Sequence, residues 1–60
     1  MYKISETTDG KFVGTVVESI ELGKSIVLGD FIFEIDSVKI LGNIVVLSNA
    51  NYVIILKKEI

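Results

Sequence analysis

Few residues in this chain could do chemistry, and the first group to consider is Gly23-Lys24-Ser25. These three residues match the end of a phosphate-binding P-loop. That motif also needs a Gly five residues earlier, where this chain has Glu18, and a following helix whose N-terminus holds the phosphates. A β-branched run follows instead. The pattern therefore predicts an ordinary turn.

Glu34 and Asp36 form a second group, because residues two apart on a strand share a face. Paired carboxylates can act as acid and base or bind a hard cation. No third ligand is spaced to join them, so we interpret the pair as part of a solvated face. The chain has no His and no Cys, which leaves nucleophilic catalysis without its most reactive groups. We expect no enzymatic activity, no metal and no cofactor.

Aromatic side chains could stack nucleic-acid bases, and the chain has five of them: Tyr2, Phe12, Phe31, Phe33 and Tyr52. Binding to phosphates requires grouped basic residues. This chain has six scattered Lys, no Arg and a net charge of −2. Phe31 and Phe33 also share a parity with Ile35, which indicates core positions. Binding to RNA or single-stranded DNA is therefore the alternative hypothesis, and we expect it to be weak.

The elements that position these residues are predicted to be short strands. No stretch keeps a helical period, and Gly, Asn and Asp interrupt the apolar runs about every eight to ten residues. The predicted strands cover residues 1–6, 11–22, 25–28 and 31–41 and a hairpin at 44–56. Lys57 and Lys58 end the last strand in solvent.

Turn chemistry and one change of parity predict the course of the chain. Asp9-Gly10 predicts a type I′ turn with positive φ at Gly10, and Gly42-Asn43 predicts a two-residue hairpin turn. Apolar residues change parity after Asp36-Ser37, which predicts a bend or bulge there. The residues expected to be buried along that bent strand are Phe33, Ile35 and Val38.

These elements predict an all-β fold with one domain over residues 1–60. The expected architecture is a small antiparallel barrel or roll of five to six short strands. The meander order and the bent strand favour an SH3-like barrel. Without Cys the chain has neither disulfides nor a cysteine zinc site.

The hairpin at 44–56 is apolar on both faces, and this surplus predicts an interface. Asn49-Ala50-Asn51 supplies its turn. If the loop has three residues, alternate side chains of the two strands share one face. If it has four residues, the register shifts by one and the side chains of the two strands are grouped differently. The common face consists of Val45, Leu47, Val53 and Ile55. We expect these four residues to contact a partner, most simply a second copy of the chain. The competing possibility is a rolled sheet that covers both faces, with Phe12 or Ile60 as a lid.

The functional hypothesis is a non-enzymatic protein-interaction or assembly module that self-associates. The chain opens without a signal segment and has no apolar run near the ~20 residues of a membrane helix. We therefore expect a cytoplasmic protein without a membrane partner. Ten Ile, and six Lys without Arg, indicate an AT-rich coding sequence. That composition is typical of an accessory protein from a phage or a low-GC bacterium.

Overall fold

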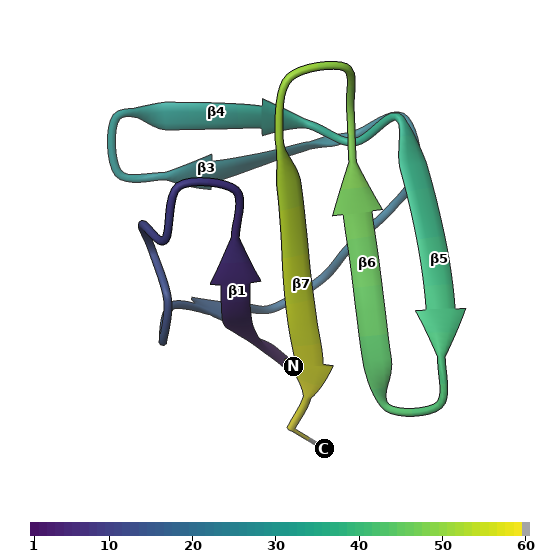
Figure 1. Ribbon diagram of the computed structural model, residues 1–60. Coiled ribbons are helices and arrows are strands. Elements are labelled where there is room, and N and C mark those ends of the chain that lie inside the picture. Colours follow the sequence, from purple (N-terminus) through teal and green to yellow (C-terminus); the bar gives the residue numbers. More distant parts are fainter. Residues whose placement is uncertain (60) are drawn as a thin grey trace.

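The computed structural model describes residues 1–59, which form strands and turns without a helix. The strands are β1 (Tyr2–Thr7), β2 (Val16–Val17), β3 (Ser25–Leu28), β4 (Phe31–Glu34), β5 (Ser37–Leu41), β6 (Ile44–Ser48) and β7 (Val53–Lys58). They build two antiparallel sheets, one of five strands in the order β2-β1-β7-β6-β5 and one of two strands, β3-β4 (Figure 1). The all-β prediction is confirmed.

The two sheets do not close into a barrel. In the larger sheet β2 and β5 are edge strands, while β3 and β4 pair only with each other. Figure 1 shows the β3–β4 hairpin crossing one end of the larger sheet. Closure would need a strand that pairs with both sheets along its length, and β2, with two residues, is too short for that role. No closed barrel is found among the described residues.

The core lies between the inner face of the larger sheet and the β3–β4 hairpin. Alternate side chains of most strands point into it, as the period of two requires, while β5 contributes only the partly buried Val38. The buried side chains are Ile4, Val17, Ile26, Leu28, Phe33, Ile35, Val45, Leu47, Ile54 and Leu56. Burying each of the larger ones stabilises the fold by about 1.5–3 kcal/mol, so most of the folding free energy originates here.

One bent segment carries the chain from the small sheet to the large one. The backbone N–H of Ile35 still donates to the carbonyl of Lys24, just before β3, at 2.9 Å, whereas the N–H of Asp36 donates to the carbonyl of Ser48 in the large sheet at 3.1 Å. Ile35 is buried and Val38, of opposite parity, is partly buried. The predicted bend and change of parity are confirmed.

The long strand predicted over residues 11–22 is wrong, because only β2 forms within it. Phe12 and Gly14 have positive φ values of 68° and 93°. A tight turn between them is closed by the N–H of Thr15, which donates to the Phe12 carbonyl at 3.1 Å. Two left-handed residues so close together are incompatible with an extended strand.

The turn after β1 differs from the predicted type. Gly10 has the expected positive φ of 78°, but Asp9 does not have a positive φ, as a type I′ turn would require. The N–H of Gly10 instead donates to Thr7 at 3.3 Å. By contrast Gly42-Asn43 forms the predicted two-residue turn, since Leu41 and Ile44 are paired.

A β-bulge in β1 determines which way Glu6 points. Ile4 pairs with Leu56 and Glu6 pairs with Ile55, so Ser5 is the extra residue. The Ser5 hydroxyl donates to the carbonyl of Ile55 at 3.2 Å. The bulge keeps Ile4 in the core and turns Glu6 onto the opposite face of the sheet.

Candidate functional site

The loop of the β6–β7 hairpin sets the register on which the interface prediction depends. Ser48 pairs with Val53, so the loop has four residues. The side-chain carbonyl of Asn49 accepts the N–H groups of Asn51 at 2.8 Å and Tyr52 at 2.9 Å. Its Nδ2 donates to the Glu34 carbonyl at 2.9 Å. Asn49 thus closes the loop and ties it to the end of β4.

This register divides the four predicted interface residues between two faces, so their grouping on one face was wrong. Val45 and Leu47 are core residues, 4% and 0% exposed. Val53 is 39% exposed, and Ile55 is partly buried on the same side of the sheet. The physical reason is the slip of one residue, which moves one strand's side chains to the other face relative to its partner.

The sheet does have an exposed apolar face, but other residues form it than those predicted. We call it the outer face, and it consists of Leu41, Ile44, Val46, Val53 and Ile55. Cross-strand pairs bring these residues together: Leu41 with Ile44, and Val46 with Ile55. All five are partly or fully exposed. The outer face is therefore a continuous apolar patch over β5, β6 and β7.

Charged residues lie at the ends of the rows that cross the outer face. One row runs Lys39, Val46, Ile55, Glu6 from β5 to β1. It has a positive charge at one end, a negative charge at the other and two apolar residues between them. The next row runs Leu41, Ile44, Lys57, Lys3. Opposite ends of the patch thus differ in charge and in polarity.

Phe12, one of the two residues considered as a lid, packs away from this face. The ring of Phe12 stacks on Phe31 of β4, with centroids 5.6 Å apart and an interplanar angle of 16°. Ile60 lies outside the described residues. The competing possibility of a lid from Phe12 is therefore wrong.

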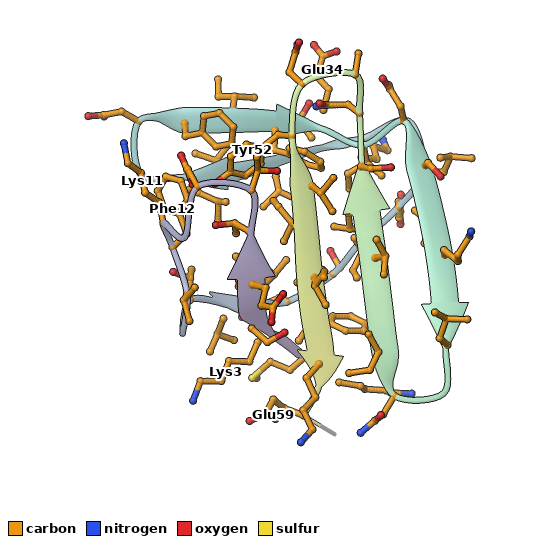
Figure 2. The ribbon with its side chains drawn as sticks, viewed as in Figure 1. Lys3, Lys11, Phe12, Glu34, Tyr52 and Glu59 are labelled. Carbon is orange, nitrogen blue, oxygen red and sulfur yellow. The ribbon has the colours of Figure 1, made fainter. Side chains whose placement is uncertain are left out.

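A second surface feature is a pocket lined by aromatic rings beside the β3–β4 turn. Phe31 stands at its centre, 5.6 Å from Phe12 and 5.1 Å from Tyr52 between ring centroids. The pocket has a volume of about 400 Å³. Its lining residues are Asp9, Lys11, Phe12, Leu28, Gly29, Asp30, Phe31 and Tyr52. Figure 2 shows Lys11, Phe12 and Tyr52 between the turn after β1 and the β3–β4 hairpin.

Backbone pairing brings the two halves of this pocket together. Thr8 and Val53 extend the β1–β7 ladder, with the N–H of Thr8 donating to Val53 at 3.1 Å and the N–H of Val53 donating to the Thr8 hydroxyl at 2.8 Å. Asp9 follows Thr8 and Tyr52 precedes Val53, so their side chains meet. The Tyr52 phenol donates a hydrogen bond to Oδ1 of Asp9.

The pKa values of both groups respond to this contact. The Tyr52 hydrogen bond, and then the Lys11 N–H that donates to Oδ1 at 3.1 Å, hold the pKa of the Asp9 carboxyl below its ordinary 3.8. Desolvation of the phenol, and then the bond to Asp9, raise the pKa of Tyr52 above its ordinary 10.0. At neutral pH the pair is therefore a carboxylate and a neutral phenol.

The sequence predicts core positions for Phe31 and Phe33 and allows Phe12 as a lid or the rings as base-stacking groups, but it predicts no surface cluster of these rings. Phe33 is 0% exposed and cannot stack a base. Phe12, Phe31 and Tyr52 gather at the pocket, while Tyr2 packs against the core elsewhere. Their separation along the chain carries no signal for this cluster, which the turn at Phe12 and the β1–β7 ladder assemble.

In the part of the chain that the structure describes, neither Gly23-Lys24-Ser25 nor the pair Glu34 and Asp36 forms a phosphate or metal site. Gly23-Lys24 lies in a turn closed by the N–H of Lys24, which donates to Glu21 at 3.1 Å, and β3 follows directly. Glu34 and Asp36 are exposed. Residues 1–59 hold no group of three or more acidic, His or Cys side chains placed to bind a metal ion. They also contain no helix with the length and apolarity needed to cross a membrane.

No protein-family model, curated protein or solved structure matches this chain. The outer face and the aromatic pocket are the two surface features with a physical basis for binding.

Proposed function

We propose that this protein is a non-enzymatic interaction module that associates with a second copy of itself through the outer face. The observation that carries the proposal is the exposed apolar patch of Leu41, Ile44, Val46, Val53 and Ile55. Apolar patches of a few hundred Å² are about the largest on ordinary monomers and commonly mark interaction sites. Two such sheets can pack face to face about 10 Å apart with their strands nearly aligned.

The rows of charge support a second copy as the partner. Consider a two-fold axis that lies in the interface, parallel to the strands and between β6 and β7. It places Lys39 of one copy opposite Glu6 of the second copy, and Val46 opposite Ile55 of the second copy. In the next row it places Ile44 opposite Lys57 and Leu41 opposite Lys3, so like charges do not meet. The row from Lys39 to Glu6 is therefore self-complementary under the symmetry that dimers most often use.

The size of the face predicts a weak dimer. With Lys3 and Glu6 of β1 at its edge, the contact surface spans four strands about 4.8 Å apart. Each strand contributes about five residues of about 3.3 Å, which gives a flat area of about 300 Å². Burying two such faces would contribute at most about 15 kcal/mol at ~25 cal/mol per Å². Association itself costs roughly 4–15 kcal/mol. The upper end of this cost offsets the whole gain, and a total buried area of about 600 Å² is well below the standard ~1,600 Å², so we expect a dissociation constant of about micromolar or weaker.

Molar mass measured by light scattering over a wide concentration range tests the proposal. The wild-type chain should approach twice its monomer mass at the highest concentrations. Ile55→Lys puts a charge at the centre of the outer face and should leave a folded monomer. Ile32→Lys is the matched control, because Ile32 is also exposed, at 64%, but lies on the small sheet.

A charge exchange tests the symmetry. Lys39→Glu or Glu6→Lys alone should weaken the dimer, and the double exchange should restore it. The two-fold dimer contains two such rim pairs, each worth only about 0.2–1 kcal/mol, so the effect on the dissociation constant is about two- to thirtyfold. A wild-type chain that stays monomeric at all concentrations, or a dimer that Ile32→Lys disrupts as much as Ile55→Lys, would contradict the proposal.

A further inference from the structure

We propose that the aromatic pocket is a second binding site, which takes an arginine side chain from a basic segment of a partner protein. The site is separate from the outer face. It consists of the rings of Phe12, Phe31 and Tyr52 and the carboxylates of Asp9 and Asp30.

The size and lining of the pocket fit one long side chain. Its volume of about 400 Å³ is at the lower end of the range for ligand sites in proteins, roughly 300–1,000 Å³. The three rings pack on one another at centroid distances of 5.6 and 5.1 Å. They form a continuous aromatic surface on which an alkyl stem or a flat cation can lie.

The conformation of Phe12 holds this surface in place. Its φ of 68° is in the left-handed region that a bulky residue rarely adopts. Such strain costs about 1–3 kcal/mol and persists where the surroundings over-determine it, which happens most often at binding and catalytic sites. Here the backbone places the ring on Phe31, where it packs against the core and also lines the pocket.

The charges of the pocket select a cation. Two carboxylates and one ammonium, those of Asp9, Asp30 and Lys11, line it, and the chain as a whole has a net charge of −2. The bonds from Tyr52 and Lys11 to Asp9 both end on Oδ1, which leaves Oδ2 to accept a donor from a ligand. The faces of aromatic rings also attract cations, by about 0.5–2 kcal/mol for each good contact.

Arginine fits this combination better than lysine. Its guanidinium is planar, stacks on aromatic faces and can donate two parallel hydrogen bonds to one carboxylate. The lysine ammonium is compact and strongly hydrated, so it gains less from a flat aromatic wall. A phosphate-bearing ligand is disfavoured, because it would meet two carboxylates.

Titrations followed by two-dimensional NMR test this site with defined probes. The probes are the blocked amino acids N-acetyl-arginine amide, N-acetyl-lysine amide and N-acetyl-citrulline amide; citrulline has the shape of arginine without its charge. Arginine should shift the resonances of Phe12, Phe31 and Tyr52 and saturate at the lowest concentration. Lysine should bind more weakly, and citrulline should produce no saturable shift.

Three variants localise the effect. Asp30→Asn should weaken arginine binding by about two- to fivefold, the size expected for one exposed ionic contact. Lys11→Gln removes the competing ammonium and should strengthen binding. Glu34→Gln, a carboxylate outside the pocket, is the matched control and should change nothing. The wild-type pattern of resonances shows that each variant remains folded.

Three outcomes would overturn the proposal. The first is equal shifts with citrulline and arginine, which would mean that the positive charge of arginine does not contribute to binding. The second is an arginine affinity unchanged in both Asp30→Asn and Lys11→Gln. The third is tighter binding of a short oligothymidine than of arginine at the same resonances, which would assign the pocket to nucleic-acid bases.

Discussion

At the scale of single residues, Asp9 shows how one side chain couples a turn to a binding surface. It accepts the Lys11 N–H within its own turn and the phenol of Tyr52 from the loop before β7. The carboxylate form is the better acceptor for both donors, which is why its pKa falls below 3.8. The turn and the pocket are therefore stabilised by the same charged state.

This coupling predicts a specific dependence of stability on pH. A carboxyl whose pKa is lower in the folded than in the unfolded chain stabilises the fold above its unfolded pKa, and that contribution is lost as the pH falls through the folded pKa. The free energy of unfolding of the wild-type chain should therefore decrease below about pH 4 partly because of Asp9. Asp9→Asn should be less stable at neutral pH and show a shallower decrease on acidification.

Urea unfolding at a series of pH values between neutral and strongly acidic measures both effects. Asp30→Asn, which removes a carboxylate from the neighbouring turn without these hydrogen bonds, is the control. Parallel curves for wild type and Asp9→Asn would show that the hydrogen bonds to Asp9 do not favour its charged form.

At the scale of elements, the β6–β7 hairpin shows how a loop sets the register of two strands. Both strands are apolar on both faces, so their composition favours neither register. Asn49 decides it, because its side chain accepts two N–H groups of the loop and donates to Glu34 of β4. The four-residue loop then places Val45 and Leu47 in the core and leaves Val46 and Ile55 outside.

Removing the Asn49 side chain should therefore cost more than its partial exposure indicates. Asn49→Ala loses three hydrogen bonds, and we expect the free energy of unfolding to fall by about 1–3 kcal/mol. Asn51→Ala, in the same loop, is the matched control, since the bond that Asn51 makes to Asn49 uses its backbone N–H. Chemical denaturation of both variants measures the difference. Equal stability of the two variants would mean that the side chain of Asn49 does not set the register.

The edges of the larger sheet are the second element-scale feature. β5 is an edge strand whose Ile40 and Leu41 are 68% and 59% exposed. Edge strands with exposed apolar residues invite pairing with other chains, and a charged residue on the strand reduces that risk. Lys39 lies in the middle of β5, and in the proposed dimer it faces Glu6 of the second copy. The same lysine therefore opposes edge-to-edge pairing and favours face-to-face packing.

At the scale of the whole molecule, size and charge restrict what the protein can bind. Six Lys without Arg on a chain of net charge −2 leave few phosphates that could be neutralised together. The aromatic rings that do gather on the surface lie beside Asp9 and Asp30. We expect the affinity for single- or double-stranded nucleic acid to be weaker than micromolar at physiological salt.

Fluorescence anisotropy with labelled single- and double-stranded oligonucleotides of mixed sequence measures that affinity. Repeating the titration at low salt separates a nonspecific electrostatic component, which should weaken steeply as salt is added. Submicromolar binding at physiological salt would favour nucleic-acid binding over the interaction module proposed above.

Local patterns in the sequence determined much of the fold. Alternation of apolar residues predicted the start of β1 and β4, because the period of two is a property of each strand by itself. Short β-branched runs bounded by Gly, Asn and Asp predicted β3 and the strands of the β6–β7 hairpin. The change of parity between Ile35 and Val38 predicted the bend between the sheets for the same reason. Gly42-Asn43 was readable as a hairpin turn, since only a few residues adopt the backbone angles that it needs.

The tertiary structure decided which surfaces are available for function. The register of β6 and β7 depends on the contact between Asn49 and Glu34, which are 15 positions apart, and a slip of one residue exchanges the core and the surface. The aromatic pocket depends on Phe12 adopting a left-handed conformation that its residue type disfavours. Local propensity predicts neither the contact between Asn49 and Glu34 nor the stacking of Phe12 on Phe31, because both arise only when segments distant in the sequence pack together.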